Sequence, residues 1–197
     1  MLINEITRSS ILDFDISIIN IPVTDTEIVG RPYIHPVGRD PYDFILGRTV
    51  IQSSQGYSDI NYILYHDDMP IAAMIANVVE TVKDDMYVQI KGISVHTKYR
   101  NMGVARVMYN YIRNHEKLNI MSDIKQTEAG WALWSKLVDT FTIRVMDIDT
   151  GEIISDDPND AYKDYFNPDN HGDNLVLVTE TIFREGFYLP EMNLSIT

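Results

Sequence analysis

Cysteine is absent from the 197 residues of the chain. Its absence excludes disulfide bonds, a cysteine nucleophile and thiolate metal sites, and it agrees with a cytosolic protein. No apolar run approaches the roughly 20 residues that cross a bilayer. The N-terminal stretch Met1–Glu5 also lacks the basic and apolar regions of a signal peptide. We therefore expect a cytoplasmic protein that does not enter a membrane.

Positive charge is scarce as well. The chain has 16 Lys and Arg residues against 29 Asp and Glu residues, which gives a formal net charge of −13. Proteins that bind nucleic acids or anionic membranes need positive potential to engage phosphates, so we expect no direct nucleic-acid binding. The acidic surface serves solubility first, and it favours basic partners such as amines, lysine side chains or basic proteins.

Several familiar ligand motifs are missing. Neither the GxxxxGK[ST] phosphate loop nor the GxGxxG dinucleotide fingerprint occurs in the chain. The acidic stretch Asp156–Asp160 lacks both the spacing of a calcium loop and its distal glutamate. We therefore predict no metal site.

The strongest positive signal is a strand followed by a polar loop and a helix. Alternating side chains predict a strand over Met86–Val95, and apolar residues at helical spacing predict a helix over Arg106–Lys117. The alternation assigns two sets of residues to opposite faces of the strand, namely Val88, Ile90 and Gly92, and Gln89, Lys91 and Ile93.

The loop between this strand and helix has the features of a phosphate site. Gly103 lets the backbone approach a ligand closely, and Lys98, Arg100 and Arg106 add positive charge. A helix begins with N–H groups that have no partner in the helix, and its dipole favours an anion there. The loop therefore predicts a phosphate or pyrophosphate site. The alternative is an unrelated α/β protein in which Gly103 only turns the chain.

The residues Arg100–Ala105 resemble the [RQ]-x-x-G-x-[GA] loop of the GNAT superfamily of acyl-CoA-dependent N-acyltransferases. Ile93–Val95 resembles the end of that family's central strand, and the resemblance extends over 61–145. It implies an α/β (α+β) fold with a mixed, mainly antiparallel twisted sheet and helices on both faces. It also implies an N-acetyltransferase that moves an acetyl group from acetyl-CoA (coenzyme A) to an amine, either a protein lysine, a protein N-terminus or a small amine.

The resemblance also implies which residues bind the cofactor. Backbone N–H groups of the loop would hold the pyrophosphate, the end of the strand would hold the pantetheine arm, and the N–H of Val95 would stabilise the oxyanion. The implied cofactor-binding residues are Ile93, Ser94, Val95, Arg100, Asn101, Met102, Gly103, Val104 and Ala105.

The sequence departs from the family where catalysis is expected. Tyr87, Gln89 and Lys91 stand in the central strand, where many members carry a glutamate. The helix predicted over 128–138 has Trp131 and Trp134 where many members have a tyrosine.

Three residues remain as candidates for the acid and base of catalysis, namely Glu80, Ser122 and Asp123. For the two carboxylates the alternative is a solvated residue at a strand end. The departures from the family also leave open a catalytically inactive GNAT-fold protein, either a binding protein or a structural protein of a virion.

A short second pattern is similar to small GNAT-like proteins of bacteriophages. It consists of Met121–Asp123, Gly130 and Leu133–Leu137. This similarity implies a location in the cytoplasm of an infected host or in a virion, where a basic host protein is one possible acceptor.

Regular spacing and turn residues predict the remaining elements. A helix is predicted over 41–55, with Asp40 as its N-cap and Pro41 at its first position. A second helix is predicted over 128–138, capped by Thr127 and packed in the core through its tryptophans. Residues 22–43 are predicted to be mostly loop. Strands are predicted within 11–21 and over 61–66, 71–82, 118–123, 141–147, 151–155 and 174–180.

We expect one domain over 1–197 that carries an acidic insertion at about 156–173 and a C-terminal extension at about 181–197. The sequence does not indicate the oligomeric state.

Overall fold

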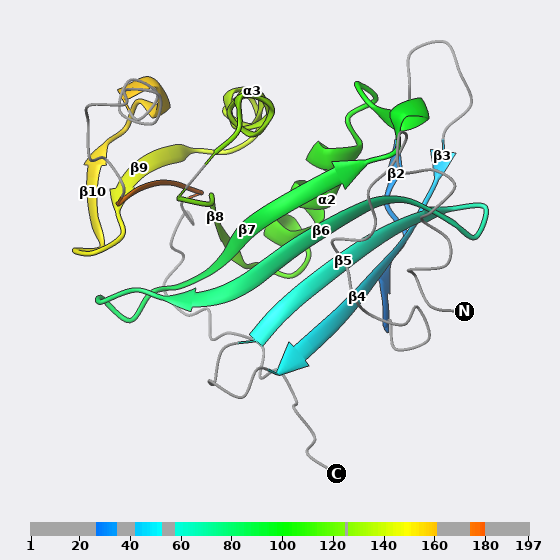
Figure 1. Cartoon of the computed structure of the whole chain (residues 1–197), viewed down its shortest axis with the longest axis horizontal. Helices are drawn as coiled ribbons and strands as arrows, with labels where there is room; N and C mark the ends of the chain where they lie inside the picture. The colour runs from blue at the N-terminus through cyan, green and yellow to red at the C-terminus, as the bar shows by residue number, and fades with distance from the viewer. Residues whose placement is uncertain (1–26, 35–41, 53–57, 125, 161–173, 180–197) are drawn as a thin grey trace.

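The computed structural model describes residues 27–34, 42–52, 58–124, 126–160 and 174–179 (Figure 1). These residues form a nine-stranded sheet in the order β1-β4-β5-β6-β7-β8-β11-β9-β10 and a ribbon of β2 and β3. Only β7 and β8 pair in parallel among the described strands, so the predicted mixed, mainly antiparallel α+β architecture is confirmed. The strands are β1 (Glu27–Gly30), β2 (Tyr33–Ile34), β3 (Tyr42–Asp43), β4 (Ile45–Gln52), β5 (Ser58–His66), β6 (Met69–Glu80), β7 (Met86–Val95), β8 (Asn119–Met121), β9 (Ile143–Asp147), β10 (Glu152–Ser155) and β11 (Leu175–Thr179).

The three antiparallel strands β5, β6 and β7 are neighbours in the sheet, and the sequence predicts a strand in each of these segments. The turn between β5 and β6 contains Asp67 at φ 50° and Asp68 at φ 61°. Two consecutive residues with positive φ give a tight turn whose twist matches that of the strands it joins. The second turn places Asp84 at φ 63° before β7 begins.

The helix predicted over 41–55 is wrong, because this segment forms β3 and β4. Phe44 and Leu46 alternate as buried residues, and β4 pairs with β5 along its whole length from Ile45 to Gln52. Thr49, Val50 and Ile51 are β-branched residues, which lose side-chain freedom in a helix and fit a pleated strand. Cross-strand pairing therefore outweighs the local helix-start signal of Asp40 and Pro41.

The stretch 22–43, predicted as mostly loop, contains β1, β2 and β3 in its described part. The strand predicted within 11–21 and the C-terminal extension lie outside the described residues. So does most of the acidic insertion, of which Asp156, Asp157, Asn159 and Asp160 are exposed.

The second half of the sheet is reached through a helix. α2 (Val104–Asn114) connects β7 to β8, and α3 (Glu128–Leu137) connects β8 to β9. Thr127 caps α3 as predicted, since its Oγ1 accepts a hydrogen bond of 3.1 Å from the N–H of Gly130. β11 then inserts between β8 and β9, which places the last described strand inside the sheet.

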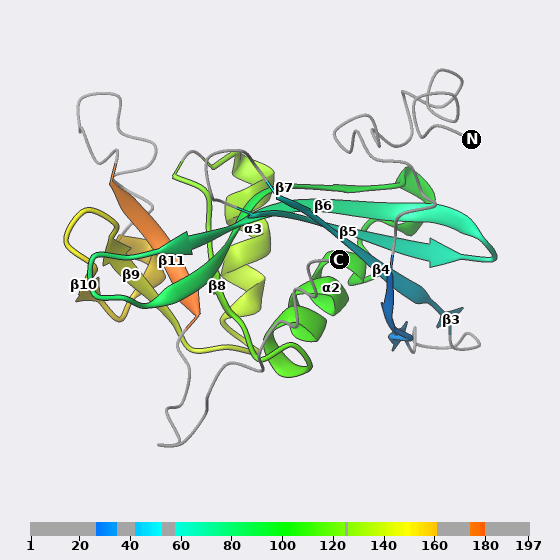
Figure 2. The ribbon, with the colours of Figure 1, turned by 90° about the horizontal axis from the view of Figure 1, so that it is seen from below.

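The main core lies between the sheet and the two α-helices. Figure 2 shows α2 along one side of β4, β5 and β6. Side chains from both helices join one buried cluster with alternate residues of these strands, among them Tyr62, Met108 and Trp134. The tryptophans of α3 therefore pack in the core as predicted. Among the described residues both α-helices contribute to this one cluster, so helices are seen on one face of the sheet only.

A β-bulge in β7 changes which side chains face the core. Ile75 pairs with Gly92 while Ala76 pairs with Ile90, so Lys91 is the extra residue. A bulge moves the following residues to the other face. Ile93 accordingly packs against the same cluster as Ile90, and the strict alternation predicted through Ile93 is wrong beyond the bulge.

Candidate functional site

Strands β7 and β8 pair over a short distance and then separate. Their register runs from Tyr87 opposite Asn119 to Gln89 opposite Met121, and β8 ends there. The next N–H, that of Ser122, donates instead to the Leu177 carbonyl oxygen of β11 at 2.8 Å. In the described part of the chain, the second half of β7 therefore has β6 as its only strand neighbour.

The backbone groups on the open edge of β7 can be assigned from the hydrogen bonds. The N–H of His96 donates to the Ile71 carbonyl oxygen at 2.8 Å, so it faces β6. Because successive peptide groups alternate in direction along a strand, the N–H and C=O groups of Ile93 and Val95 face the separation from β8. The Val95 carbonyl oxygen accepts a bond of 2.9 Å from the Arg100 Nε, which agrees with this direction.

A cavity of about 810 Å³ opens beside this edge. Four segments line it: the end of β7, the loop after it, the first turn of α2 and one face of α3. The lining residues are Ile93, Ser94, Val95, Tyr99, Arg100, Asn101, Met102, Gly103, Val104, Ala105, Arg106, Ala129, Ala132, Leu133, Lys136 and Leu137.

The loop at the start of α2 has a tight, left-handed backbone. A 3₁₀ turn (Thr97–Tyr99) is followed by Asn101 at φ 61° and Gly103 at φ 82°. Gly103 occupies the N-cap position of α2 and provides no side-chain cap. The first amides of the helix therefore point into the cavity region with their hydrogen-bonding capacity available for a ligand.

The electrostatic character of the cavity is opposite to that of the whole chain. Arg100, Arg106 and Lys136 line it, and no carboxylate is among its lining residues in the described structure. Lys98 lies just outside, with its Nζ 5.5 Å from the centre of the Tyr99 ring. The positive charge and the helix start together favour an anionic ligand.

All nine residues predicted to bind the cofactor line this one cavity. Their role in binding remains a prediction, but the fold brings both predicted segments to the same place. The sequence analysis missed the contribution of α3. Its lining residues recur at helical spacing and include two alanines, and this pattern marks a face with room for a ligand; they are Ala129, Ala132, Leu133, Lys136 and Leu137.

Tyr99 is a second lining residue that the sequence analysis did not single out. Its ring is almost completely buried, and its hydroxyl lies 3.0 Å from the Nδ1 of His66. Edge-on ring contacts with His66 and His96 complete the packing. Tyr99 therefore anchors the loop to the turn between β5 and β6.

Of the catalytic candidates, Ser122 is fully buried at the end of β8. Its Oγ accepts a bond of 2.9 Å from the N–H of Leu177 and lies 3.0 Å from the Asp123 carbonyl oxygen, to which it donates. These bonds tie β8 to β11. The hydroxyl is therefore already engaged within the described structure.

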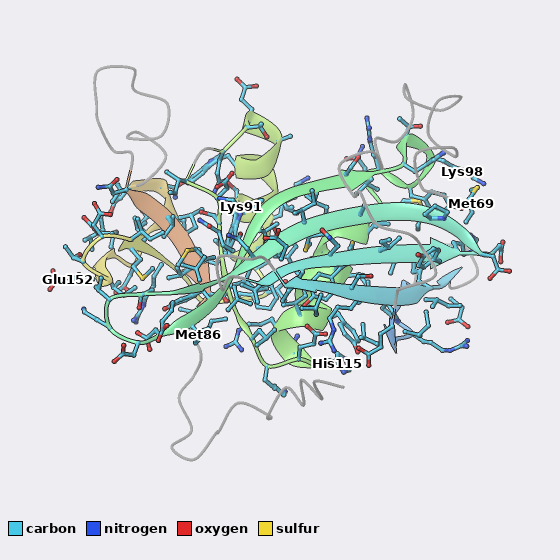
Figure 3. All side chains as sticks on the ribbon, turned by 60° about the horizontal axis from the view of Figure 1, so that its bottom comes forward. Met69, Met86, Lys91, Lys98, His115 and Glu152 are labelled. Atoms are coloured by element: carbon cyan, nitrogen blue, oxygen red, sulfur yellow. The ribbon has the colours of Figure 1, made fainter. Side chains whose placement is uncertain are left out.

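Asp123 lies where β7 and β8 separate, next to the cavity residues in the fold but not among the residues that line the cavity. Its Oδ1 accepts bonds from the Lys91 Nζ at 2.7 Å and from the Ile124 N–H at 2.9 Å. The Lys91 Nζ also reaches the Gln89 Oε1 at 3.2 Å, and the Gln89 Nε2 donates to the Ser122 carbonyl oxygen at 3.2 Å. Figure 3 shows Lys91 midway along β7, so this polar group lies at the branch point of the sheet.

Glu80 is not brought to the cavity. It is exposed and pairs with Met86 at the start of β7, whereas the cavity begins at Ile93. Figure 3 shows Met86 and Lys98 at opposite ends of this strand region. Met86 and Val95 are separated by roughly 30 Å of extended chain, too far for Glu80 to act even through one water.

In the part of the chain that the structure describes, no three His, Asp or Glu side chains gather as ligands of one metal ion. None of the described helices has the length and apolar character needed to cross a membrane.

A scan against models of protein families found no match to the chain, and a search of curated proteins found none. Solved structures that resemble the fold include Arabidopsis thaliana Naa50 in complex with the bisubstrate analogue CoA-Ac-MVNAL. The two chains are 15% identical, the match covers 61% of this chain and 72% of that chain, and the TM-score is 0.37. A likeness at this level assigns neither a family nor an activity. The function must therefore be inferred from the geometry of the site itself.

Proposed function

We propose that this protein is an N-acetyltransferase that uses acetyl-CoA and acts on an amine. The observation that carries the proposal is the positively lined cavity at the separation of β7 and β8, into which the start of α2 points. A helix start, a free strand edge and a cluster of cations in one cavity suit a ligand that has both a diphosphate and amide groups.

The residues present fit such a ligand. The amides from Met102 to Ala105 lie at the helix start, where they are suited to hold the diphosphate. Arg100, Arg106 and Lys136 add charge that an anion of this kind attracts. The free edge of β7 has the N–H and C=O groups that the amides of a pantetheine arm pair with, as an added strand does.

Acetyl-CoA supplies an activated acetyl group as a thioester. For the transfer, the chain itself must position the amine, stabilise negative charge on the carbonyl oxygen and accept a proton. The N–H of Val95 faces the separation of the strands and is suited to stabilise the negative charge on the carbonyl oxygen. We assign the role of proton acceptor to Asp123, whose position is held by the ion pair with Lys91. Ser122 then serves to fix the end of β8.

Calorimetric titration with acetyl-CoA tests the proposal. The variant Gly103→Glu puts bulk, negative charge and an unfavourable φ at the helix start, so the affinity should fall at least about tenfold. Gly92→Glu is the matched control. A Cβ at Gly92 meets no heavy atom within 4 Å, and Gly92 does not line the cavity. Equal affinity of the two variants, or no binding to the wild-type protein, contradicts the proposal.

A second candidate is a cofactor-binding protein without turnover. The remote position of Glu80 and the engaged hydroxyl of Ser122 favour it, since they remove two of three catalytic candidates. Release of free thiol from acetyl-CoA across a panel of amines separates the two. Binding without thiol release supports the second candidate, and loss of release in Asp123→Asn supports the enzyme.

A further inference from the structure

The sheet face opposite α2 and α3 carries a polar group of residues, which we call the carboxamide patch: Asp59, Asn61, Asn77 and Gln89. Asp59 pairs with Asn77 across β5 and β6, and Asn77 pairs with Gln89 across β6 and β7. Asn61 lies two residues from Asp59 and therefore on the same face. Alternate residues of these strands, such as Ile60 and Ala76, belong to the core on the helix side.

The patch leads to the branch point of the sheet. Its inner end is Gln89, whose side chain bonds to both Lys91 and the Ser122 carbonyl oxygen. Its outer end is Asp59, which is exposed. The patch thus connects the surface to the position of Asp123 on the face away from the helices that line the cofactor cavity.

Two acceptors in the patch have no hydrogen-bond donor among the described residues. Asn61 is 4% exposed, and its Oδ1 has no partner among the described residues. The Oδ1 of Asn77 is also buried and lacks a partner in the described structure. Buried polar atoms are nearly always paired, because an unpaired one is unfavourable. Two adjacent orphan acceptors beside a proposed reaction site therefore indicate a ligand that brings donors.

We propose that the carboxamide patch binds the acceptor substrate, and that this substrate is a primary amine with further N–H donors beside the reacting nitrogen. The inference rests on the proposed function. The exposed carboxylate of Asp59 attracts the ammonium form at the outer end, and the carboxamide oxygens pair with N–H groups of the bound substrate. A site with two acceptors to satisfy discriminates against an amine with an apolar body.

The test compares two probes, alanyl-alanine amide and hexylamine, in calorimetric titrations of the wild-type protein, Asn61→Leu and Asn77→Leu. We expect the wild-type protein to bind the dipeptide amide more tightly than hexylamine. Asn61→Leu should weaken binding of the dipeptide amide about tenfold, because one acceptor is lost. It should leave affinity for acetyl-CoA unchanged.

Thermal unfolding gives a second readout. Leucine has the same number and branching of side-chain heavy atoms as asparagine and no orphan acceptor, so Asn61→Leu should keep or raise the melting temperature. Asn110→Leu is the matched control. The Asn110 Oδ1 is likewise buried and without a partner among the described residues, but it lies on α2 away from the patch. This control should leave binding of the dipeptide amide unchanged.

The outcomes separate the two proposals. If Asn61→Leu and Asn77→Leu bind the dipeptide amide as the wild-type protein does, or only lose stability, the patch is structural and this inference is wrong. If acetyl-CoA does not bind while the dipeptide amide binds in an Asn61-dependent way, the patch stands and the acetyltransferase proposal fails.

Discussion

Two residues in the loop before α2 have a backbone conformation that shapes the cavity. Asn101 and Gly103 both have positive φ, a region that most residues avoid and that asparagine and glycine tolerate best. The sequence therefore meets the local requirement at both positions. The left-handed turns direct the amides of the helix start toward the cavity, and side chains of other types would bring strain to this point.

Tyr62 gives a prediction about pH. It is fully buried, and its hydroxyl donates to the Glu116 Oε2 at 2.5 Å. Burial and, after it, the Glu116 carboxylate raise the pKa of Tyr62 above its ordinary value. Above about pH 10 the unfolded chain loses this proton while the folded protein keeps it, so the free energy of unfolding falls as pH rises.

Tyr62→Phe should therefore show a smaller fall in stability above about pH 10, by as much as about 1.4 kcal/mol per pH unit. Urea unfolding at a series of alkaline pH values measures the slope. Burial also raises the pKa of Tyr109, so some dependence should remain. An unchanged slope in the variant would show that Tyr62 is not responsible.

At the scale of elements, the site depends on the separation of two parallel strands. β8 ends after three paired residues, and the bulge at Lys91 turns the second half of β7. Because of the bulge, Ile93 and Val95 pack on the core while Lys91 reaches across to Asp123. The bulge thus places one charged residue at the branch point and leaves one strand edge open.

The C-terminal end of α2 is tied to the sheet through Glu116. Its carboxylate accepts bonds from the Arg48 Nη1 at 2.9 Å and from the Tyr62 hydroxyl. Burial lowers the pKa of Arg48, but the carboxylates of Glu116 and Glu27 raise it by more, so the pKa is raised overall. This arrangement fixes the far end of the helix that presents its N-terminus to the cavity.

Glu116→Gln should lower the free energy of unfolding by about 1–3 kcal/mol, because Arg48 and Tyr62 lose a charged acceptor. Affinity for acetyl-CoA should stay nearly constant, since the 11-residue helix is about 16 Å long and the tie is at its other end. Urea unfolding and calorimetry provide the two measurements. Glu27→Gln is the control: Glu27 is 68% exposed, so its ion pair with Arg48 should contribute little. Equal losses in both variants would contradict the assignment.

At the scale of the whole molecule, the positive charge that lines the cavity contrasts with the negative net charge of the chain. The chain has a net charge of −13, yet cations line the cavity. The remaining surface therefore repels anionic ligands at long range while the cavity attracts them at short range. The same surface attracts cations, which suits the proposed reaction between an anionic cofactor and an amine.

Salt should affect the two ligands differently. Raising the ionic strength from about 0.01 M to about 1 M shortens the screening length from about 30 Å to about 3 Å. It should weaken the binding of amines, because their attraction comes from distributed surface charge. Acetyl-CoA should lose less affinity, since its contacts are short and the repelling surface is screened as well. Titrations at both salt concentrations test this, and a larger loss for acetyl-CoA would be the contrary result.

Local patterns in the sequence determined much of this protein. The bounds of β7, the hairpin of β5 and β6, the cap of α3 by Thr127 and the glycine at the start of α2 all follow from periodicity and turn chemistry, which act over a few residues. The nine residues predicted to bind the cofactor follow instead from the resemblance of Ile93–Val95 and Arg100–Ala105 to the GNAT superfamily, which is also a local pattern.

Only the tertiary structure decided the rest. Pairing with β5 made residues 45–52 a strand despite a helix-start signal, and a bulge at Lys91 reversed the faces of β7. The meeting of Lys91 with Asp123, the distance of Glu80 from the cavity and the lining by α3 depend on which strands are neighbours. Such contacts join residues far apart in the chain, and their energies appear only when the sheet forms, so no local pattern contains them.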